Sequence, residues 1–266
     1  MMFDSHIHTN FSSDSDMKIE EVINVIKSKD IGVILTEHLD LNYPDENMFR
    51  LDIDSYFKAY EKHRSDKLLI GIEIGLDEEE LADDCKRIAN NYNFDFILGS
   101  THLVEGVDIY EEEYYKNKAT GEVYDLRSIY DKYFNAMLRL IKKNPYFDSM
   151  AHIDYIPRYA SRFHENTEII YKEYSYIIDE ILKELISMDK ALEINTRRLN
   201  DKETVNNLIP IYKKFKEFGG KYVTIGSDSH SKDAIAMNFS NALEIAEHAE
   251  LTPVYFKERK IKLLNI

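Results

Sequence analysis

Residues 31–38 read IGVILTEH, a short apolar run that ends in a carboxylate and an imidazole. The run is rich in β-branched and large aliphatic residues, which favours a buried β-strand from Ile31 to Thr36. Parallel α/β folds carry their chemistry just beyond the carboxyl ends of their strands. Glu37 and His38 therefore stand where a functional site would be expected.

The same pattern recurs along the whole chain. Other short apolar runs predict strands at Met2 to Ile7, Leu68 to Ile74, Phe94 to Gly99, Phe147 to Ala151, Ala191 to Asn195 and Lys221 to Gly226. Stretches with helical periodicity lie between and after them, at Lys18 to Ser28, Ile53 to His63, Glu78 to Asn90, Leu126 to Lys142, Glu168 to Ser187, Thr204 to Phe218 and Ala234 to His248. Strict alternation of strand and helix predicts a mainly parallel sheet.

Seven strand–helix pairs can close as a barrel or stay open as a doubly wound sheet. No glycine-rich phosphate loop follows the first predicted strand, and candidate ligands come from the ends of nearly every strand. A closed ring can focus all these ends on one point, so we expect an α/β chain folded as a (β/α)7 barrel. The absence of a linker or repeat favours a single domain spanning residues 1–266. The long acidic segment from Leu103 to Asp125 is expected to be a lid, a binding loop or partly disordered.

The composition argues against several classes of protein. The formal net charge of −15 is unsuited to a protein that wraps nucleic acid, although a small anionic substrate is still compatible with it. The single cysteine, Cys85, is expected to be a buried apolar residue and fits a reducing compartment, with the cytoplasm as the default. The sequence shows neither a signal-like amino terminus nor an apolar run of membrane-spanning length. We expect no membrane association, and the oligomeric state is left open.

Six of the nine histidines lie at or just beyond predicted strand ends: His6, His8, His38, His102, His152 and His230. A histidine pair such as His6 and His8 is by itself more often structural than metal-binding. The context changes this balance. Glu73 lies inside an apolar strand, where an uncompensated carboxylate is costly, and Asp228 follows the last predicted strand.

Imidazoles and carboxylates without thiolates favour Zn, Mn or Fe over a structural cysteine-based zinc site. The set holds more ligands than one ion needs. A carboxylate such as Glu73 could bridge ions in a two- or three-metal cluster, an arrangement suited to phosphoryl transfer. The residues alone therefore predict metal-dependent phosphate-ester hydrolysis.

The motifs, taken in order, resemble a known family. They are residues 4–9 (DSHIHT), 11–15 (FSSDS), 36–38 (TEH), 71–73 (GIE), 99–102 (GSTH), 151–154 (AHID) and 227–230 (SDSH). This order resembles the PHP (polymerase and histidinol phosphatase) superfamily, and most of all its stand-alone histidinol-phosphate phosphatase branch. The resemblance covers essentially the whole chain.

The resemblance implies a distorted seven-stranded barrel that holds three divalent metal ions. It assigns one ion to His6, His8, Glu73 and Asp228, a second to Glu73, His102 and His152, and a third to Asp14, His38 and His230. Some relatives carry histidine in place of Asp14, and an acidic ligand there favours a harder or more positively charged ion, so the choice among Zn, Mn and Fe stays open. We expect Glu73, Asp228 and His230 to be the catalytic members of the set. The implied substrate is a small phosphorylated metabolite, L-histidinol phosphate.

Four arginines follow predicted strand ends and are candidates to bind the substrate phosphate: Arg158, Arg162, Arg197 and Arg198. Guanidinium groups match phosphate in two-point geometry, and we prefer Arg158 and Arg197. Three alternatives stay open: a PHP protein tyrosine phosphatase, a nucleotide or nucleic-acid phosphoesterase, and a non-catalytic PHP accessory domain. The first differs in the motif at residues 8–12, the second needs a basic surface, and the third tends to lose ligands.

Overall fold

The computed structural model describes residues 1–78 and 81–264. Seven consecutive parallel strands form most of one sheet, in the order in which they occur along the chain. They are β1 (Phe3–Ile7), β2 (Gly32–Leu39), β3 (Leu68–Gly75), β4 (Phe96–Ser100), β7 (Ser149–Met150), β8 (Ala191–Asn195) and β9 (Tyr222–Gly226). Each lies within or overlaps a strand predicted from the sequence.

The two ends of this parallel series meet at the carboxyl edge of the sheet. The Asp228 N–H donates to the His6 carbonyl at 2.7 Å, and the His8 N–H donates to the Ser229 carbonyl at 2.9 Å. Ile7 forms a parallel bridge with Ser229. These contacts join β1 to the segment that follows β9, so the strands curve round as an α/β barrel whose mouth is formed by their carboxyl ends.

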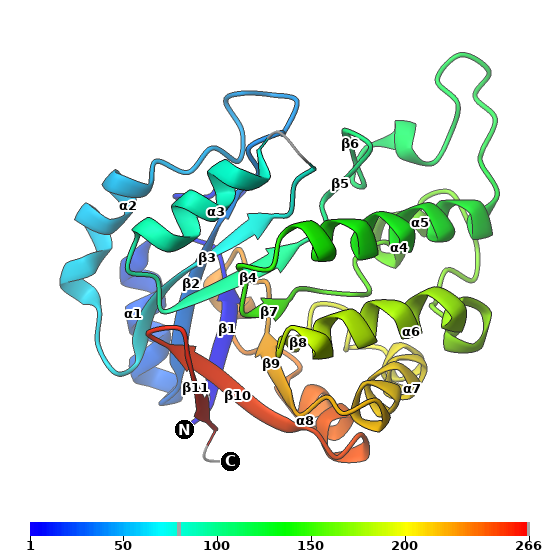
Figure 1. Ribbon diagram of the computed structural model, residues 1–266. Coiled ribbons are helices and arrows are strands. Elements are labelled where there is room, and N and C mark those ends of the chain that lie inside the picture. Colours follow the sequence, from blue (N-terminus) through cyan, green and yellow to red (C-terminus); the bar gives the residue numbers. More distant parts are fainter. Residues whose placement is uncertain (79–80, 265–266) are drawn as a thin grey trace.

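Helices cover the outside of the strands (Figure 1). They are α1 (Ile19–Lys29), α2 (Ile53–Tyr60), α3 (Ala82–Asn91), α4 (Leu126–Lys143), α6 (Tyr171–Ser187), α7 (Lys202–Glu217) and α8 (Phe239–His248), with short α5 (Pro157–Ala160) and the 3₁₀ turns η1 (Glu61–His63), η2 (Glu112–Tyr114) and η3 (Lys232–Ala234). Their apolar faces pack on the sheet, as Tyr133 and Phe134 of α4 do, both fully buried. None of the helices in the described ranges is long and apolar enough to span a bilayer.

The last predicted helix starts later than expected, at Phe239 instead of Ala234. The Ala236 N–H donates to a carboxylate oxygen of Asp4 on β1 at 2.8 Å, and Asn238 has a φ of 58°. A left-handed residue interrupts a helix, and here it allows the chain to close over β1. At the start of the third predicted helix, Glu79 and Glu80 lie outside the described residues.

A carboxyl-terminal hairpin extends the sheet and was absent from the sequence prediction. Strand β10 (Thr252–Lys257) pairs in parallel with β9, and β11 (Lys260–Leu263) returns antiparallel to it. The hairpin lies at the amino-terminal end of the barrel strands, where Arg259 in its turn contacts Asp148. It therefore forms part of the barrel floor, away from the mouth.

The segment from Leu103 to Asp125 is ordered beside the mouth. It contains a small hairpin of β5 (Leu103–Val104) and β6 (Val107–Asp108). Glu105 and Gly106 turn the hairpin with φ values of 53° and 77°, and glycine adopts the second of these without strain. Further along, buried Tyr115 stacks on Phe163 at 4.9 Å between ring centroids. The segment thus forms one wall of the site.

Candidate metal centre

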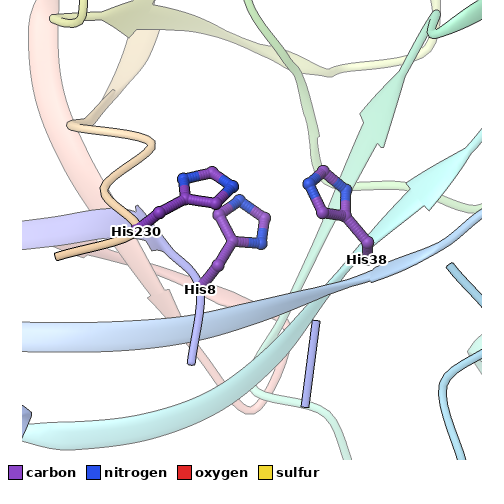
Figure 2. Close-up of side chains that lie close together, drawn as sticks. All are labelled: His8, His38 and His230. Atoms are coloured by element: carbon purple, nitrogen blue, oxygen red, sulfur yellow. The ribbon is translucent and has the colours of Figure 1, made fainter. Parts of the chain in front are cut away.

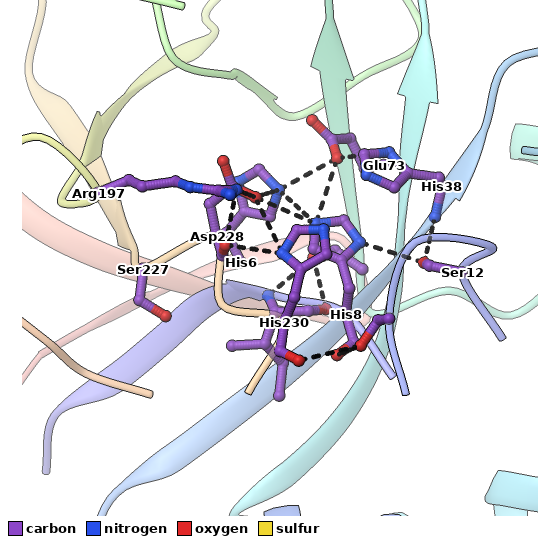
Figure 3. A network of polar contacts seen from close by, with 12 residues as sticks. His6, His8, Ser12, His38, Glu73, Arg197, Ser227, Asp228 and His230 are labelled. Carbon is purple, nitrogen blue, oxygen red and sulfur yellow. Dashed lines mark hydrogen bonds and ion pairs between the residues drawn. The ribbon is translucent and has the colours of Figure 1, made fainter. Parts of the chain in front are cut away.

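All nine predicted metal ligands converge at the barrel mouth, from six different strands or the loops that follow them. Figure 3 labels His6, His8, His38, Glu73, Asp228 and His230 of this set. Four overlapping groups have ligand atoms within 4.8 Å of one another: His8, His38 and His230; His6, His8 and Asp228; His6, Glu73 and His152; and His38, Glu73 and His102. Asp14 joins the set through His230, whose Nε2 lies 2.9 Å from its Oδ2.

Glu73 lies at the centre of the cluster. Its Oε1 is 3.0 Å from His152 Nε2 and 3.2 Å from His102 Nε2. Its Oε2 is 3.1 Å from His6 Nε2 and 3.0 Å from His38 Nδ1. Oε2 also lies 3.5 Å from His8 Nε2. Each oxygen therefore faces a different set of imidazoles, an arrangement that suits a carboxylate shared by two ions.

The pair formed by His6 and His8 fits a cation. Their Nε2 atoms are 3.0 Å apart, and Asp228 Oδ1 lies 3.8 Å from the first and 3.5 Å from the second. Burial lowers the pKa of His6, but Glu73 and Glu193 raise it overall, whereas burial and the neighbouring His38 lower the pKa of His8. The two nitrogens therefore lie close enough together, with Asp228 beside them, to bind one divalent ion.

The outer part of the cluster brings together the imidazoles of His8, His38 and His230 (Figure 2). The ring of His8 lies 4.1 Å from that of His38 and 4.4 Å from that of His230, measured between centroids. The Nδ1–H of His230 can donate to the Asp228 carbonyl at 3.0 Å, which leaves Nε2 for a ligand bond beside Asp14. His38 Nε2 lies 3.6 Å from the same Asp14 oxygen.

Buried carboxylates in this centre stay ionised. Burial raises the pKa of Glu73, but His6, His38 and His102 lower it to well below its usual value. For Asp228, burial also raises the pKa, and Arg158 and His6 more than offset this. Ionised carboxylates and imidazole nitrogens are the donor set that Zn, Mn and Fe accept, so the residues present fit divalent metal ions.

Three buried carboxylates outside the predicted ligand set orient the imidazoles. Glu193 Oε1 accepts from His6 Nδ1 at 2.7 Å, and Asp40 Oδ1 accepts from His102 Nδ1 at 2.9 Å. Glu37 acts indirectly: the Ser12 hydroxyl donates to its Oε2 at 2.7 Å, so the Ser12 oxygen can accept from the Nδ1–H of His8 at 3.2 Å.

Each of these bonds places the proton on Nδ1 and turns Nε2 towards the cluster, as partners of metal-binding histidines do. Sequence reasoning missed these partners as site residues. Asp40 directly follows an apolar strand and Glu193 lies inside one, as predicted ligands do, and this position was the available signal. Their partners are distant along the chain, with Glu193 and His6 separated by 187 residues.

A cavity of about 500 Å³ opens onto the cluster, and two of the four predicted arginines line it. Arg158 donates to Asp228 Oδ2 at 2.6 Å and to Asn195 Oδ1 at 2.8 Å, and its Nε is buried without a partner among the described residues. Arg197 is more exposed and lies 3.4 Å from Asp228 Oδ1. Both can present N–H groups to an anion beside the cluster.

The structure places the other two arginines outside the residues that line this cavity. Arg162 donates to the Tyr110 carbonyl and lies over the rings of Tyr110 and Tyr159 at 4.9 and 5.3 Å. Arg198 pairs with Asp154 at 3.1 Å and with Glu168. Their guanidinium groups therefore hold neighbouring parts of the wall together.

Histidines and carboxylates gathered at the carboxyl ends of parallel barrel strands define the class of the molecule, a metal-dependent enzyme built on an α/β barrel. Comparison with known proteins gives the family. Residues 4–197 match the model of the PHP domain, and the chain belongs to this family. The prediction made from the motif order is thereby confirmed.

The similar proteins extend over nearly the whole chain. A probable histidinol-phosphatase of Clostridium acetobutylicum is 51% identical over 262 residues, covering 98% of this chain and 99% of that protein. The histidinol-phosphatase of Lactococcus lactis is 30% identical over 240 residues, covering 85% and 83%. A crystal structure of the Lactococcus lactis histidinol phosphate phosphatase, in complex with zinc, L-histidinol and phosphate, has a TM-score of 0.89 and 28% identity, and covers 98% of each chain. This match confirms the predicted PHP type of barrel.

Proposed function

We propose that this chain is a metal-dependent histidinol-phosphatase, which hydrolyses L-histidinol phosphate to L-histidinol and phosphate. The observation that carries the proposal is the convergence of a complete ligand set with Arg158 at one cavity. The choice of substrate comes from the relatives, because proteins that are similar over most of their length are named histidinol-phosphatases. The solved relative binds both products of the reaction.

The proposed centre takes three divalent ions within one PHP domain of residues 1–266. His6, His8, Glu73 and Asp228 would hold the first, Glu73, His102 and His152 the second, and Asp14, His38 and His230 the third. When bound, such ions supply a water of lowered pKa and neutralise charge on the phosphoryl oxygens. Zinc is favoured by the solved relative, while manganese and iron are also compatible with the donor set.

The chain's own residues position the ester. Arg158 is held by Asp228 and Asn195 with its guanidinium plane beside the cluster, so it can donate to phosphoryl oxygens without reorganising. Arg197 would add a second, more mobile donor from the rim. We propose these two arginines as the phosphate-binding residues, and Glu73, Asp228 and His230 as the groups closest to the reacting atoms.

The structure disfavours the alternatives to different degrees. A non-catalytic accessory domain would be expected to have lost ligands, and here all nine meet. A nucleic-acid phosphoesterase would have to bind its polyanion with a chain of net charge −15. A tyrosine phosphatase shares the metal chemistry and is separated from our proposal by the motif at residues 8–12 and by its substrate.

Turnover by protein reconstituted with zinc or manganese tests the proposal. We expect kcat/KM for L-histidinol phosphate to exceed that for p-nitrophenyl phosphate, a phosphotyrosine peptide and an oligonucleotide by about a hundredfold or more. The reason is that the part of the natural substrate remote from the phosphate adds binding energy in the transition state. A flat profile across these esters would contradict the assignment of substrate while leaving the hydrolase intact.

A further inference from the structure

The acidic residues of the segment from Glu105 to Glu113 fall into two groups. Glu105, Glu112 and Glu113 are not among the residues that line the cavity, and each pairs with a lysine, namely Lys132, Lys116 and Lys118. Asp108 and Glu111 line the cavity above the metal centre. Neither forms an ion pair with a lysine or arginine of the described residues.

Asp108 is held rigidly beside a metal ligand. It pairs with Leu103 across the β5–β6 hairpin, one residue beyond His102, and the Ile109 N–H donates to the His102 carbonyl at 3.0 Å. The Tyr110 N–H donates to Asp108 Oδ1 at 2.7 Å. The residue is only 7% exposed, and its carboxyl group meets the Tyr43 hydroxyl and the nearby His102 imidazole but no lysine or arginine of the described residues.

Burying a carboxylate without a lysine or arginine partner is costly. Such a carboxylate in a cavity is therefore a candidate to bind a cationic ligand. Arg158 and Arg197, which follow β7 and β8, line the same cavity. The cavity therefore carries both signs of charge, with guanidinium groups from the segments after β7 and β8 and carboxylates from the segment after β4. A ligand that matches it has a phosphate at one end and a cation at the other.

We propose that Asp108, assisted by Glu111 at the rim, binds the cationic aminoalkyl end of the substrate and thereby determines specificity. This inference rests on the proposed function, since L-histidinol phosphate carries an ammonium group and an imidazole on the carbon chain that bears its phosphate. The carboxylates offer the ammonium charge-assisted hydrogen bonds. They also offset the repulsion that a cationic substrate meets at a centre rich in metal ions and arginine.

The test compares Asp108→Asn and Glu111→Gln with Glu105→Gln and Glu113→Gln, which remove the same charge from the outer face of the same segment. Each holoenzyme is assayed with L-histidinol phosphate and with p-nitrophenyl phosphate, which has no cation. The Asp108→Asn change should lower the ratio of the two kcat/KM values by about tenfold to a hundredfold. Glu111→Gln should lower it less, and the two outer variants should leave it unchanged.

Product inhibition gives a second readout that does not require turnover of the natural ester. With p-nitrophenyl phosphate as substrate, Asp108→Asn should raise the inhibition constant of L-histidinol by a larger factor than that of inorganic phosphate. An equal loss for both inhibitors and both substrates would show a merely structural role and overturn the inference. No change in either ratio would overturn it as well.

Failure of the proposed function would look different. In that case the wild-type protein itself would show no preference for L-histidinol phosphate over p-nitrophenyl phosphate, whatever the variants do. The inhibition constants would still decide the inference, because they report whether Asp108 recognises a cationic amino alcohol. Thermal melts of each variant identify any that fail to fold.

Discussion

Asp95 and Asp148 at one end of the barrel and Glu73 at the other are buried carboxylates with different partners. At the amino-terminal end, Asp95 pairs with Arg64 at 3.3 Å and Asp148 pairs with Arg259. At the carboxyl end, Glu73 faces five imidazoles and has no lysine or arginine partner among the described residues. The floor balances these charges with its own arginines, whereas Glu73, unlike its neighbour Asp228, is left to imidazoles and to cations from solution. The ion pairs at the floor therefore contribute to stability, whereas the carboxylate at the mouth of the same sheet serves function.

The largest expected effect comes from removing the central carboxylate of the mouth. Glu73→Ala should lower kcat/KM on the order of a thousandfold and reduce the bound metal, because each Glu73 oxygen faces a different set of imidazoles. Elemental analysis and steady-state kinetics measure both. Full metal content together with full turnover in this variant would refute the proposed centre.

The next largest effect is expected from arginine, and it compares Arg158 at the mouth with Arg64 at the floor. Arg158→Ala should lower kcat/KM for phosphate esters by about a hundredfold, as expected when one preorganised donor to a phosphoryl group is lost. Arg64→Ala, at the floor, removes the same group beside Asp95 and should leave kcat/KM unchanged. Similar kinetic losses in the two variants would show that Arg158 acts through the fold instead of through the phosphate.

A smaller effect is expected from a carboxylate that only orients a ligand. Asp40→Asn weakens the acceptor for His102 Nδ1–H and should reduce metal affinity by about tenfold to a hundredfold. Gly75→Ala should act in the same direction, since a Cβ there would lie 2.0 Å from Asp40 Oδ1. Competition with a chelator measures the metal affinity. Wild-type affinity in both variants would contradict the role of Asp40 in positioning His102.

The smallest effect on the site is expected from the floor. Arg259→Ala should lower the free energy of unfolding by about 1–3 kcal/mol and leave metal content intact. Burial already raises the pKa of Asp148, and Arg259 counteracts this, so the variant raises that pKa further. A folded state with a raised carboxyl pKa loses stability as pH increases, so the penalty should be larger at pH 8 than at pH 5. Denaturant titrations at both pH values provide the check.

The sequence predicted the mouth better than its surroundings. Each strand that contributes ligands is an apolar run with an imidazole or carboxylate in it or just after it. This local pattern was sufficient to predict that His6, His102 and Asp228 share one site. The β5–β6 hairpin was missed because strands of two residues carry no periodicity. The orienting bonds of Asp40 and Glu193 were missed because they join residues far apart in the sequence, where only the fold creates the contact.

The central claim is that the barrel mouth is a cluster of divalent metal ions. Elemental analysis of the protein after reconstitution with zinc and removal of free metal tests it most directly. The account predicts about three ions per chain, lost together with L-histidinol phosphate turnover on treatment with a strong chelator and restored with it on readdition of metal. Turnover that persists in protein free of metal would contradict the account.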